Sequence, residues 1–180
     1  MKTYSVPTRD EVAPEDQVIF DTLKKNIGFV PNLYAFMATS KNALGRYLAF
    51  QGVKSSLSNK EKEAINLVVS QINDCKYCQS AHTTIGKMNG FSEDEIIHIR
   101  KGHSSDPKLN ALVHLAKDIT LHRGRAGKDS LEAFYHAGYS EATLIDVVMQ
   151  IADKVVMNYI HNLTEVPIDF PIAEELPELV

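Results

Sequence analysis

The chain has 180 residues, with 19 Lys and Arg against 23 Asp and Glu, and its formal net charge is −4. This balance disfavours nucleic acid as a partner, because a polyphosphate surface calls for a concentrated basic face. The apolar share is 44% and the charged share 23%, which is typical of a folded protein and argues against disorder.

The apolar stretches of the chain do not favour export or membrane insertion. The first seven residues contain no apolar run of the length that a signal peptide needs. The most apolar segment, 144–160, is interrupted by Asp146, Asp153 and Lys154, so we do not expect it to span a membrane. We therefore expect a cytoplasmic protein, in a compartment where thiols are normally kept reduced.

Apolar residues recur at spacings of three and four along most of the chain, which predicts an all-α fold. Ser58 and Ser92 each precede a Glu by three residues, a pattern typical of a capping box at a helix start. A final run, from about residue 166 to 180, contains prolines and acids and predicts an extended arm, which could lie on a neighbouring subunit or be a frayed tail. The predicted helices cover residues 16–25, 33–38, 42–55, 58–72, 73–89, 92–100, about 106–119, 130–136 and 140–161.

One short pattern occurs twice. The segment GFSEDEI at 90–96 has the form of GYSEATL at 138–144, a helix stop, an aromatic residue and a new cap. We expect a single domain over residues 1–180, and the repetition suggests that it contains two related helical halves.

Both cysteines of the chain, Cys75 and Cys78, lie in one C-x-x-C, and His82 follows four residues later. On a helix these three side chains would share one narrow stripe, since each residue turns by about 100°. Amides at a helix start favour a thiolate, and an imidazole one turn away can take up the thiol proton. The spacing therefore predicts an activated dithiol. The alternatives are small buried residues that fill a helix face, or a zinc site completed by a further histidine.

Glu63 is a further candidate for the same site. Glu61 is accounted for by the capping box, whereas Glu63 lies at the edge of the apolar arc of its predicted helix. A carboxylate there could face the dithiol helix, or it could be a surface group paired with Lys60. The basic loop 122–128 could bind an anion or a partner, but we favour a solvated connection between helices.

These residues resemble the sequence signature of the alkylhydroperoxidase D and carboxymuconolactone decarboxylase superfamily. The resemblance is strongest over about residues 40–125, which we expect to form the redox core, and the length and the Asp169-Phe170-Pro171 tail resemble the peroxidase-related branch. The matching residues are Glu63, Val69-Ser70, Asn73, Cys75, Tyr77-Cys78, Ala81 and His82.

The resemblance implies an all-helical homotrimer or hexamer with thiol peroxidase or disulfide reductase activity. By this resemblance Cys78 attacks the peroxide, Cys75 resolves it, and Glu63 and His82 relay protons. The best-studied branch carries a histidine between its cysteines, where this chain has Tyr77, so one member of the relay is missing. The decarboxylase side of the superfamily typically lacks the cysteine pair, which counts against a lactone decarboxylase.

We therefore expect a thiol-dependent peroxidase that reduces hydroperoxides through a C-x-x-C dithiol/disulfide cycle. An external thiol or dithiol reductant would regenerate it, and we expect no metal or other cofactor. The alternatives are a protein dithiol–disulfide oxidoreductase without a peroxide step, and a non-catalytic redox-sensing or metal-binding module.

Overall fold

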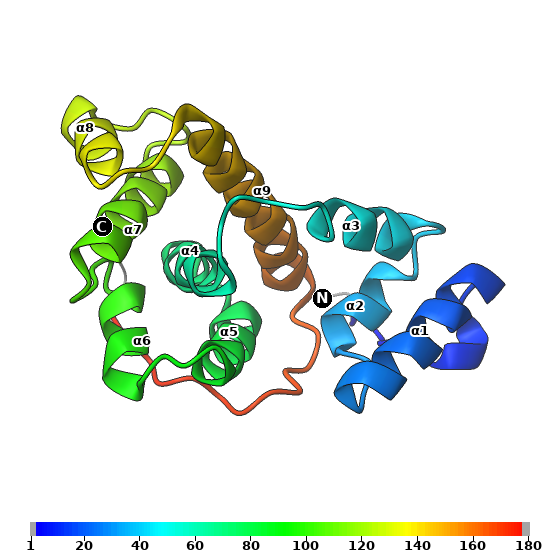
Figure 1. Ribbon diagram of the computed structural model, residues 1–180. Coiled ribbons are helices and arrows are strands. Elements are labelled where there is room, and N and C mark those ends of the chain that lie inside the picture. The colour runs from blue at the N-terminus through cyan, green and yellow to red at the C-terminus, as the bar shows by residue number, and fades with distance from the viewer. Residues whose placement is uncertain (1–2, 178–180) are drawn as a thin grey trace.

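The computed structural model describes residues 3–177, and in that range the protein is built of helices without a strand, as the sequence predicts (Figure 1). No helix within those residues is long and apolar enough to cross a membrane. The described elements are a short 3-10 helix η1 (Arg9–Glu11) and nine α-helices: α1 (Pro14–Ile27), α2 (Asn32–Met37), α3 (Ala43–Gln51), α4 (Asn59–Ile72), α5 (Lys76–Met88), α6 (Glu93–Arg100), α7 (Pro107–Leu121), α8 (Lys128–His136) and α9 (Glu141–Thr164).

Helix α4 lies at the centre of the larger core. Figure 1 shows it end-on, with α5, α6, α7 and α9 around it, and it contacts all four. Every residue from Glu63 to Gln71 is buried, so this helix has no solvent-facing side over more than two turns. A helix that is covered all round needs apolar residues on every side, and Ala64, Ile65, Leu67 and Val68 are fully buried. The polar residues of this stretch are therefore held inside the protein, where they need partners.

A second core joins the N-terminal helices to the dithiol segment. It includes Leu33 and Leu44 from α2 and α3, Tyr77 and Cys78 from α5, and Met157 from α9. In Figure 1, α1, α2 and α3 lie together to one side of the bundle formed by α4 to α9. The cysteines thus lie where the two groups of helices meet.

The predicted helix boundaries agree with the structure to within three residues, except for the end of the helix predicted over 42–55. Two of the deviations have a clear structural cause. The helix predicted over 42–55 ends at Gln51, because the amide and the hydroxyl of Ser56 both donate to Asp146 of α9 at 2.6 Å. The helix predicted from residue 73 begins at Lys76, because Asp74 has a positive φ of 47°. The first deviation depends on a tertiary contact and the second on a left-handed backbone, and neither is visible as periodicity.

The two copies of the short repeated pattern make the same kind of turn. Gly90 and Gly138 have φ of 86° and 89°, in the left-handed region that favours glycine. Ser92 and Ser140 then cap α6 and α9 through hydrogen bonds that their side chains accept. Whether the chain contains two related halves, or one domain over residues 1–180, stays a prediction.

Residues 165–177 form no helix and follow the surface as an extended arm. In Figure 1 this arm leaves the end of α9 and passes α5 and α6. The Ala173 amide donates to the Ser80 hydroxyl at 3.1 Å, and the Asn32 amide donates to Asp169 at 2.8 Å. The arm is therefore anchored on α5 and on the start of α2 of its own chain. Residues 178–180 of the predicted arm, and residues 1–2, lie outside the described residues.

Candidate active site

Cys75 is the N-cap of α5 and does not belong to its first turn. Its φ of −84° and ψ of 96° are extended, and its Sγ accepts a hydrogen bond of 3.2 Å from the Cys78 amide. The preceding left-handed residue, Asp74, lets the Cys75 amide donate back to the Ser70 carbonyl at 3.0 Å. The prediction that Cys75 shares one helical stripe with Cys78 and His82 is therefore wrong. Cys78 and His82 lie one turn apart on α5, and Cys75 reaches the start of the helix from the cap position.

The two thiols differ in access. Both cysteines are free and buried, Cys75 with 0% of its surface exposed and Cys78 with 2%. Cys78 lines a cavity of about 770 Å³, whereas Cys75 is not part of the cavity wall. Cys78 therefore borders the space that a ligand could enter, and Cys75 does not.

Segments from both ends of the chain and from the bundle build the cavity. Aromatic rings form much of its wall. Two further lining residues are apolar and exposed, Ile27 at 50% and Met88 at 81%, so the cavity has an apolar rim. The rings that line the cavity are Phe29, Tyr34, Tyr47, Tyr77 and Phe170. The site therefore offers an apolar body of space next to one buried thiol.

Glu63 and His82 form a buried pair in the wall of the same cavity. Nδ1 of His82 lies 2.7 Å from Oε2 of Glu63, and Asn66 donates to Oε1 of Glu63 at 3.0 Å. Burial and the nearby charge of Lys154 lower the pKa of His82, so the imidazole is neutral at neutral pH. Burial opposes ionisation of Glu63, but the contacts with His82 and Lys154 outweigh it and lower its pKa.

This geometry fixes the tautomer of the imidazole. A neutral His82 donates its Nδ1 hydrogen to the ionised Glu63, which leaves Nε2 as a proton acceptor. The expected position of Glu63 beside the dithiol helix is what the structure shows. The alternative partner, Lys60, instead lies over the ring of Phe91, with its Nζ 4.8 Å from the ring centroid.

Helix α9 supplies charged and polar groups to the site that the C-x-x-C pattern does not indicate. Lys154 lines the cavity, and Asn158 is fully buried one turn further along. Burial raises the pKa of the Cys78 thiol, but a hydrogen bond with Cys75, the charge of Lys154 and a hydrogen bond with Asn158 outweigh it, and the pKa is lowered. Burial, together with the contact with Cys78, raises the pKa of the Cys75 thiol. Of the two thiols, Cys78 is therefore the one whose surroundings favour ionisation.

A signal for these residues was present in the sequence. Asp153 and Lys154 interrupt the most apolar segment of the chain, and each has only 3% of its surface exposed. Charged side chains inside an apolar helix are expensive to bury, so they mark a functional or a structural site. Spacing within the C-x-x-C region could not reveal them, because they come from a helix far along the chain.

Tyr77 occupies the position between the cysteines and acts as a structural tie. Its hydroxyl donates to Oδ1 of Asp169 at 2.6 Å and accepts from the Leu33 amide at 3.3 Å. It therefore holds the C-terminal arm against α2 and α5. In this chain the residue between the cysteines links three segments around the cavity.

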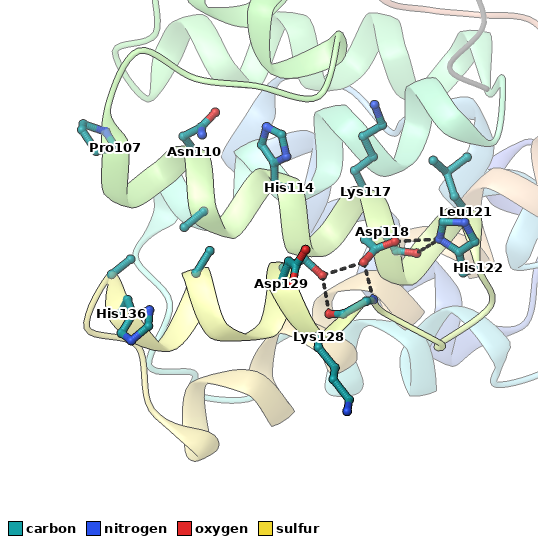
Figure 2. A pocket seen from close by; sticks show the side chains of 15 residues that line it. Pro107, Asn110, His114, Lys117, Asp118, Leu121, His122, Lys128, Asp129 and His136 are labelled. Atoms are coloured by element: carbon teal, nitrogen blue, oxygen red, sulfur yellow. Dashed lines mark hydrogen bonds and ion pairs between the residues drawn. The ribbon is translucent and has the colours of Figure 1, made fainter.

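A second, open pocket lies between α7 and α8 and contains neither cysteine (Figure 2). Asp118 accepts hydrogen bonds from the Gly127 amide and the Ser130 hydroxyl, both at 2.6 Å, and contacts His122 Nδ1 at 2.7 Å. Figure 2 shows these contacts converging on one carboxylate. They order the basic loop 122–128 as a connection between the two helices, which is the interpretation that the sequence favours.

Residues 3–177 contain no metal-binding geometry. No group of three or more His, Cys, Asp or Glu side chains is arranged in this range to hold a metal ion. In particular, within these residues Cys75, Cys78 and His82 are not joined by the fourth ligand that a tetrahedral zinc site requires. The candidate site is thus a dithiol, a Glu–His pair and a buried lysine around one cavity.

Comparison with known proteins gives one family and several related folds. The model of the carboxymuconolactone decarboxylase family matches residues 35–118. A curated relative, the uncharacterized protein YdfG of Bacillus subtilis (strain 168), is 29% identical over 101 residues, which is 54% of this chain and 69% of that protein.

Solved structures with the same fold cover nearly the whole chain. An uncharacterized peroxidase-related protein with an alkylhydroperoxidase core, from Ralstonia eutropha JMP134, superposes with a TM-score of 0.83 at 18% identity, covering 92% of this chain and 91% of its own. The debrominase Bmp8, as a cysteine-to-alanine variant in complex with 2,3,4-tribromopyrrole, superposes with a TM-score of 0.76 at 19% identity, covering 94% and 93%. At these identities the likeness shows a shared fold.

Proposed function

The chain belongs to the alkylhydroperoxidase D and carboxymuconolactone decarboxylase superfamily, and on this premise we propose that it is a thiol-dependent peroxidase with a C-x-x-C dithiol/disulfide cycle. One observation carries the proposal. Of the two thiols, Cys78 borders the cavity, and the Glu63–His82 pair lines that same cavity. A nucleophile, a base and the group that orients the base thus surround one space where a substrate can bind.

The reaction consumes two thiols for each hydroperoxide. The Cys78 thiolate attacks one peroxide oxygen, so that an S–O bond forms, the O–O bond breaks and an alcohol leaves after protonation. Cys75 then attacks the sulfenic acid, which releases water and forms a disulfide. An external thiol or dithiol returns the two electrons by thiol–disulfide exchange.

The Glu63–His82 pair accounts for the proton movements. With Nδ1 bound to Glu63, Nε2 of His82 accepts the proton of the Cys78 thiol, which lies one turn earlier on α5. The resulting imidazolium is stabilised by the adjacent carboxylate and can return the proton to the leaving oxygen. Glu63 acts by orienting the imidazole and balancing its charge.

A reductive dehalogenation is a second candidate, favoured by the shape of the cavity. Hydrogen peroxide alone does not need a space of about 770 Å³ lined by five aromatic rings. One structural neighbour is a debrominase that was solved with a brominated pyrrole. A dithiol can supply the same two electrons to a carbon–bromine bond, which gives the reduced ring, a bromide ion, a proton and the Cys75–Cys78 disulfide.

The test uses the reduced protein and counts its products. Stoichiometric cumene hydroperoxide should remove two thiols per molecule and yield an intramolecular disulfide by mass spectrometry. A brominated pyrrole tested in parallel should leave the thiols unchanged and release no bromide.

If both thiols survive the hydroperoxide, the peroxidase proposal is wrong. Bromide release would then favour dehalogenation, exchange with protein disulfides would favour an oxidoreductase, and stoichiometric zinc after purification would favour a metal-binding module.

We also propose that the protein works as a homotrimer or hexamer and in the cytoplasm, where a reducing environment would keep the dithiol active. The support for assembly is an exposed apolar stripe along α9, whose members lie on one face of the helix at about 100° per residue. The stripe consists of Ile145, Val148, Met149, Val156, Tyr159 and Leu163, each at least 42% exposed.

A further inference from the structure

Helix α9 carries two adjacent charged side chains inside the protein. Asp153 and Lys154 are each 3% exposed, and Nζ of Lys154 lies 3.9 Å from Oδ2 of Asp153. Apolar residues of similar size in place of a buried ion pair are often neutral or stabilising. Stability alone therefore does not explain the pair, and its position beside the cavity suggests a chemical role.

Amide side chains, more than the lysine, hold Asp153 in place. Nε2 of Gln150 donates to Oδ2 of Asp153 at 3.3 Å and to Oδ1 of Asn66 at 2.8 Å. Asn66 in turn donates to Glu63 at 3.0 Å. Since an amide does not relay protons, this network fixes the positions of two carboxylates across α4 and α9.

Lys154 lines the cavity, and no close partner among the described residues balances its charge. Within residues 3–177 its ammonium group makes no hydrogen bond, and its ion pair with Asp153 is long. A buried cation without close partners attracts any negative charge that forms nearby. The titratable groups that face it come from four helices: Tyr34 on α2, Glu63 on α4, Cys78 and His82 on α5, and Asp153 on α9.

The charges around the thiol show why a cation is needed. Asp153 opposes ionisation of Cys78, and Glu63 lines the same cavity, so a thiolate at Cys78 shares this site with two carboxylates. Like charges in a buried site oppose ionisation strongly. Among the groups that bear most on the Cys78 thiol, Lys154 is the cation that favours its ionisation. Lys62 lines the same cavity, but it is only partly buried.

We propose that Lys154 is the cation that holds Cys78 as a thiolate, and that Asp153 is a positioning residue for Lys154. This inference rests on the proposed dithiol chemistry. It adds the group that stabilises the negative charge on the sulfur of Cys78. The residues of the C-x-x-C region and Glu63 come from α4 and α5, whereas Lys154 reaches the thiol from α9.

The test follows ionisation of the thiol in the reduced protein, without any peroxide. Thiolate absorbance and the rate of alkylation by iodoacetamide are measured against pH, and peptide mass mapping assigns the label to Cys78. Lys154→Met should raise the apparent pKa of Cys78 by about one to two units, and so slow alkylation at neutral pH by about 10-fold or more. Above the new pKa, the rate should return to that of the wild type. Lys154→Arg should keep most of the wild-type profile.

Lys76→Met is the matched control. Lys76 lies between the cysteines in sequence, but its side chain is 45% exposed and pairs with Asp74 at 3.0 Å. Solvent screens this charge, so its removal should leave the Cys78 profile unchanged. An equal shift in Lys76→Met and Lys154→Met would overturn the proposal, because it would show that the thiol senses overall charge.

A second variant guards against a failure to fold. Lys154→Met alone leaves Asp153 as an unpaired buried charge, whereas the double variant Asp153→Asn, Lys154→Met leaves a neutral site. The double variant should show a smaller rise in the pKa of Cys78, because it also removes an aspartate that opposes the thiolate. A wild-type profile in a folded double variant, with melting and circular dichroism as the check, would contradict the role of Lys154.

These outcomes are separate from those of the peroxidase proposal. If the wild type ignores hydroperoxides while ionisation of Cys78 depends on Lys154, the proposed function fails and the inference stands. If the wild type reduces hydroperoxides while the folded Lys154→Met protein keeps the wild-type thiol titration, the function stands and the inference fails.

Discussion

Tyr77, which lies between the two cysteines, donates a hydrogen bond of 2.6 Å from its hydroxyl to Oδ1 of Asp169 on the C-terminal arm. The other carboxylate oxygen of Asp169 accepts from the Asn32 amide at the start of α2, at 2.8 Å. The ring of Phe170 packs edge-on against Tyr77 and Phe29, with centroids 5.6 and 5.5 Å apart. One wall of the cavity is therefore closed by a contact that begins inside the C-x-x-C.

Tyr77→Phe should loosen this closure, because it removes the hydroxyl and keeps the ring. We expect the free energy of unfolding to fall by about 1.5–3 kcal/mol, the range for a hydrogen bond to a charged group. We also expect a bulky maleimide to label Cys78 faster. Chemical denaturation and labelling kinetics measure the two effects. Tyr135→Phe, at a partly exposed tyrosine on α8, is the control and should change neither quantity. If Tyr77→Phe also leaves both unchanged, its hydroxyl does not hold the arm in place.

The sequence predicted those features of the fold that depend on local patterns. The capping boxes at Ser58 and Ser92 are formed by side chains three residues apart, so the sequence contains everything that they need. For Glu63, the arc of its helix allows a position facing the dithiol helix but leaves a surface position beside Lys60 equally open. The contact with His82 in the structure decides between the two.

The parts that the sequence did not predict depend on contacts between distant segments. The backbone at Asp74 is left-handed, which moves the helix start and turns Cys75 into a cap. Lys154 approaches Cys78 from a helix that begins more than sixty residues later, so no spacing near the cysteines indicates it. The partner of Tyr77 on the arm is likewise 92 residues away in the chain.

Glu63→Gln should slow the oxidation of the thiols by hydroperoxide at neutral pH. The amide removes the negative charge that orients His82 and stabilises its protonated form, so general base catalysis should fall, by about 100-fold. Stopped-flow measurement of thiol loss gives the rate, and circular dichroism confirms the fold. Glu132→Gln, at an exposed position on α8, is the control and should leave the rate unchanged. Unchanged kinetics in a folded Glu63→Gln protein would reduce Glu63 to a structural group.

The free energy of unfolding should decrease at acid pH, because the buried imidazole of His82 is neutral in the folded protein and takes up a proton more readily when the chain unfolds. Burial and the charge of Lys154 lower its pKa below 6.5 in the folded protein, so unfolding favours proton uptake. The stability that the neutral imidazole supports is complete above about pH 6.5 and is lost as the pH falls through the folded pKa. Chemical denaturation across this pH range should show that the free energy of unfolding falls less steeply with decreasing pH in His82→Gln than in the wild type. His136→Gln, at an exposed site on α8, should follow the wild type, and identical profiles for all three proteins would refute the prediction.

The apolar stripe on α9 predicts assembly in solution. Val148 and Val156 lie on the same face and are 46% and 42% exposed, so a lysine at position 148 should place a charge in any interface formed there. We expect light scattering to give a trimer or hexamer for the wild type and a smaller species for Val148→Lys. Val53→Lys, at an exposed valine outside α9, should assemble normally. A wild-type mass near 20.1 kDa at micromolar concentration would rule out the oligomer.

The two sulfurs should have different roles, with Cys78 attacking the peroxide and Cys75 resolving the product. The helix dipole alone would favour the thiol nearer the helix start, but burial raises the pKa of Cys75, while Cys78 has a lowered pKa and lines the cavity. Cys75→Ser keeps an N-cap side chain that can accept from the Cys78 amide, so α5 should retain its start. In that variant, peroxide should convert Cys78 to a sulfenic acid that dimedone traps, and no disulfide should form.

The complementary variant completes the assignment. In Cys78→Ser, the remaining thiol is fully buried, lies outside the cavity wall and has a raised pKa, so Cys75 should react with hydroperoxide slowly if at all. Mass spectrometry of the dimedone adduct at each cysteine, over a time course with equal peroxide, compares the two variants directly. Prompt labelling of Cys75 in Cys78→Ser, together with an inert Cys78 in Cys75→Ser, would reverse the roles. Because Cys75 would then have to ionise behind the cavity wall, that outcome would also require the wall to open before the chemical step.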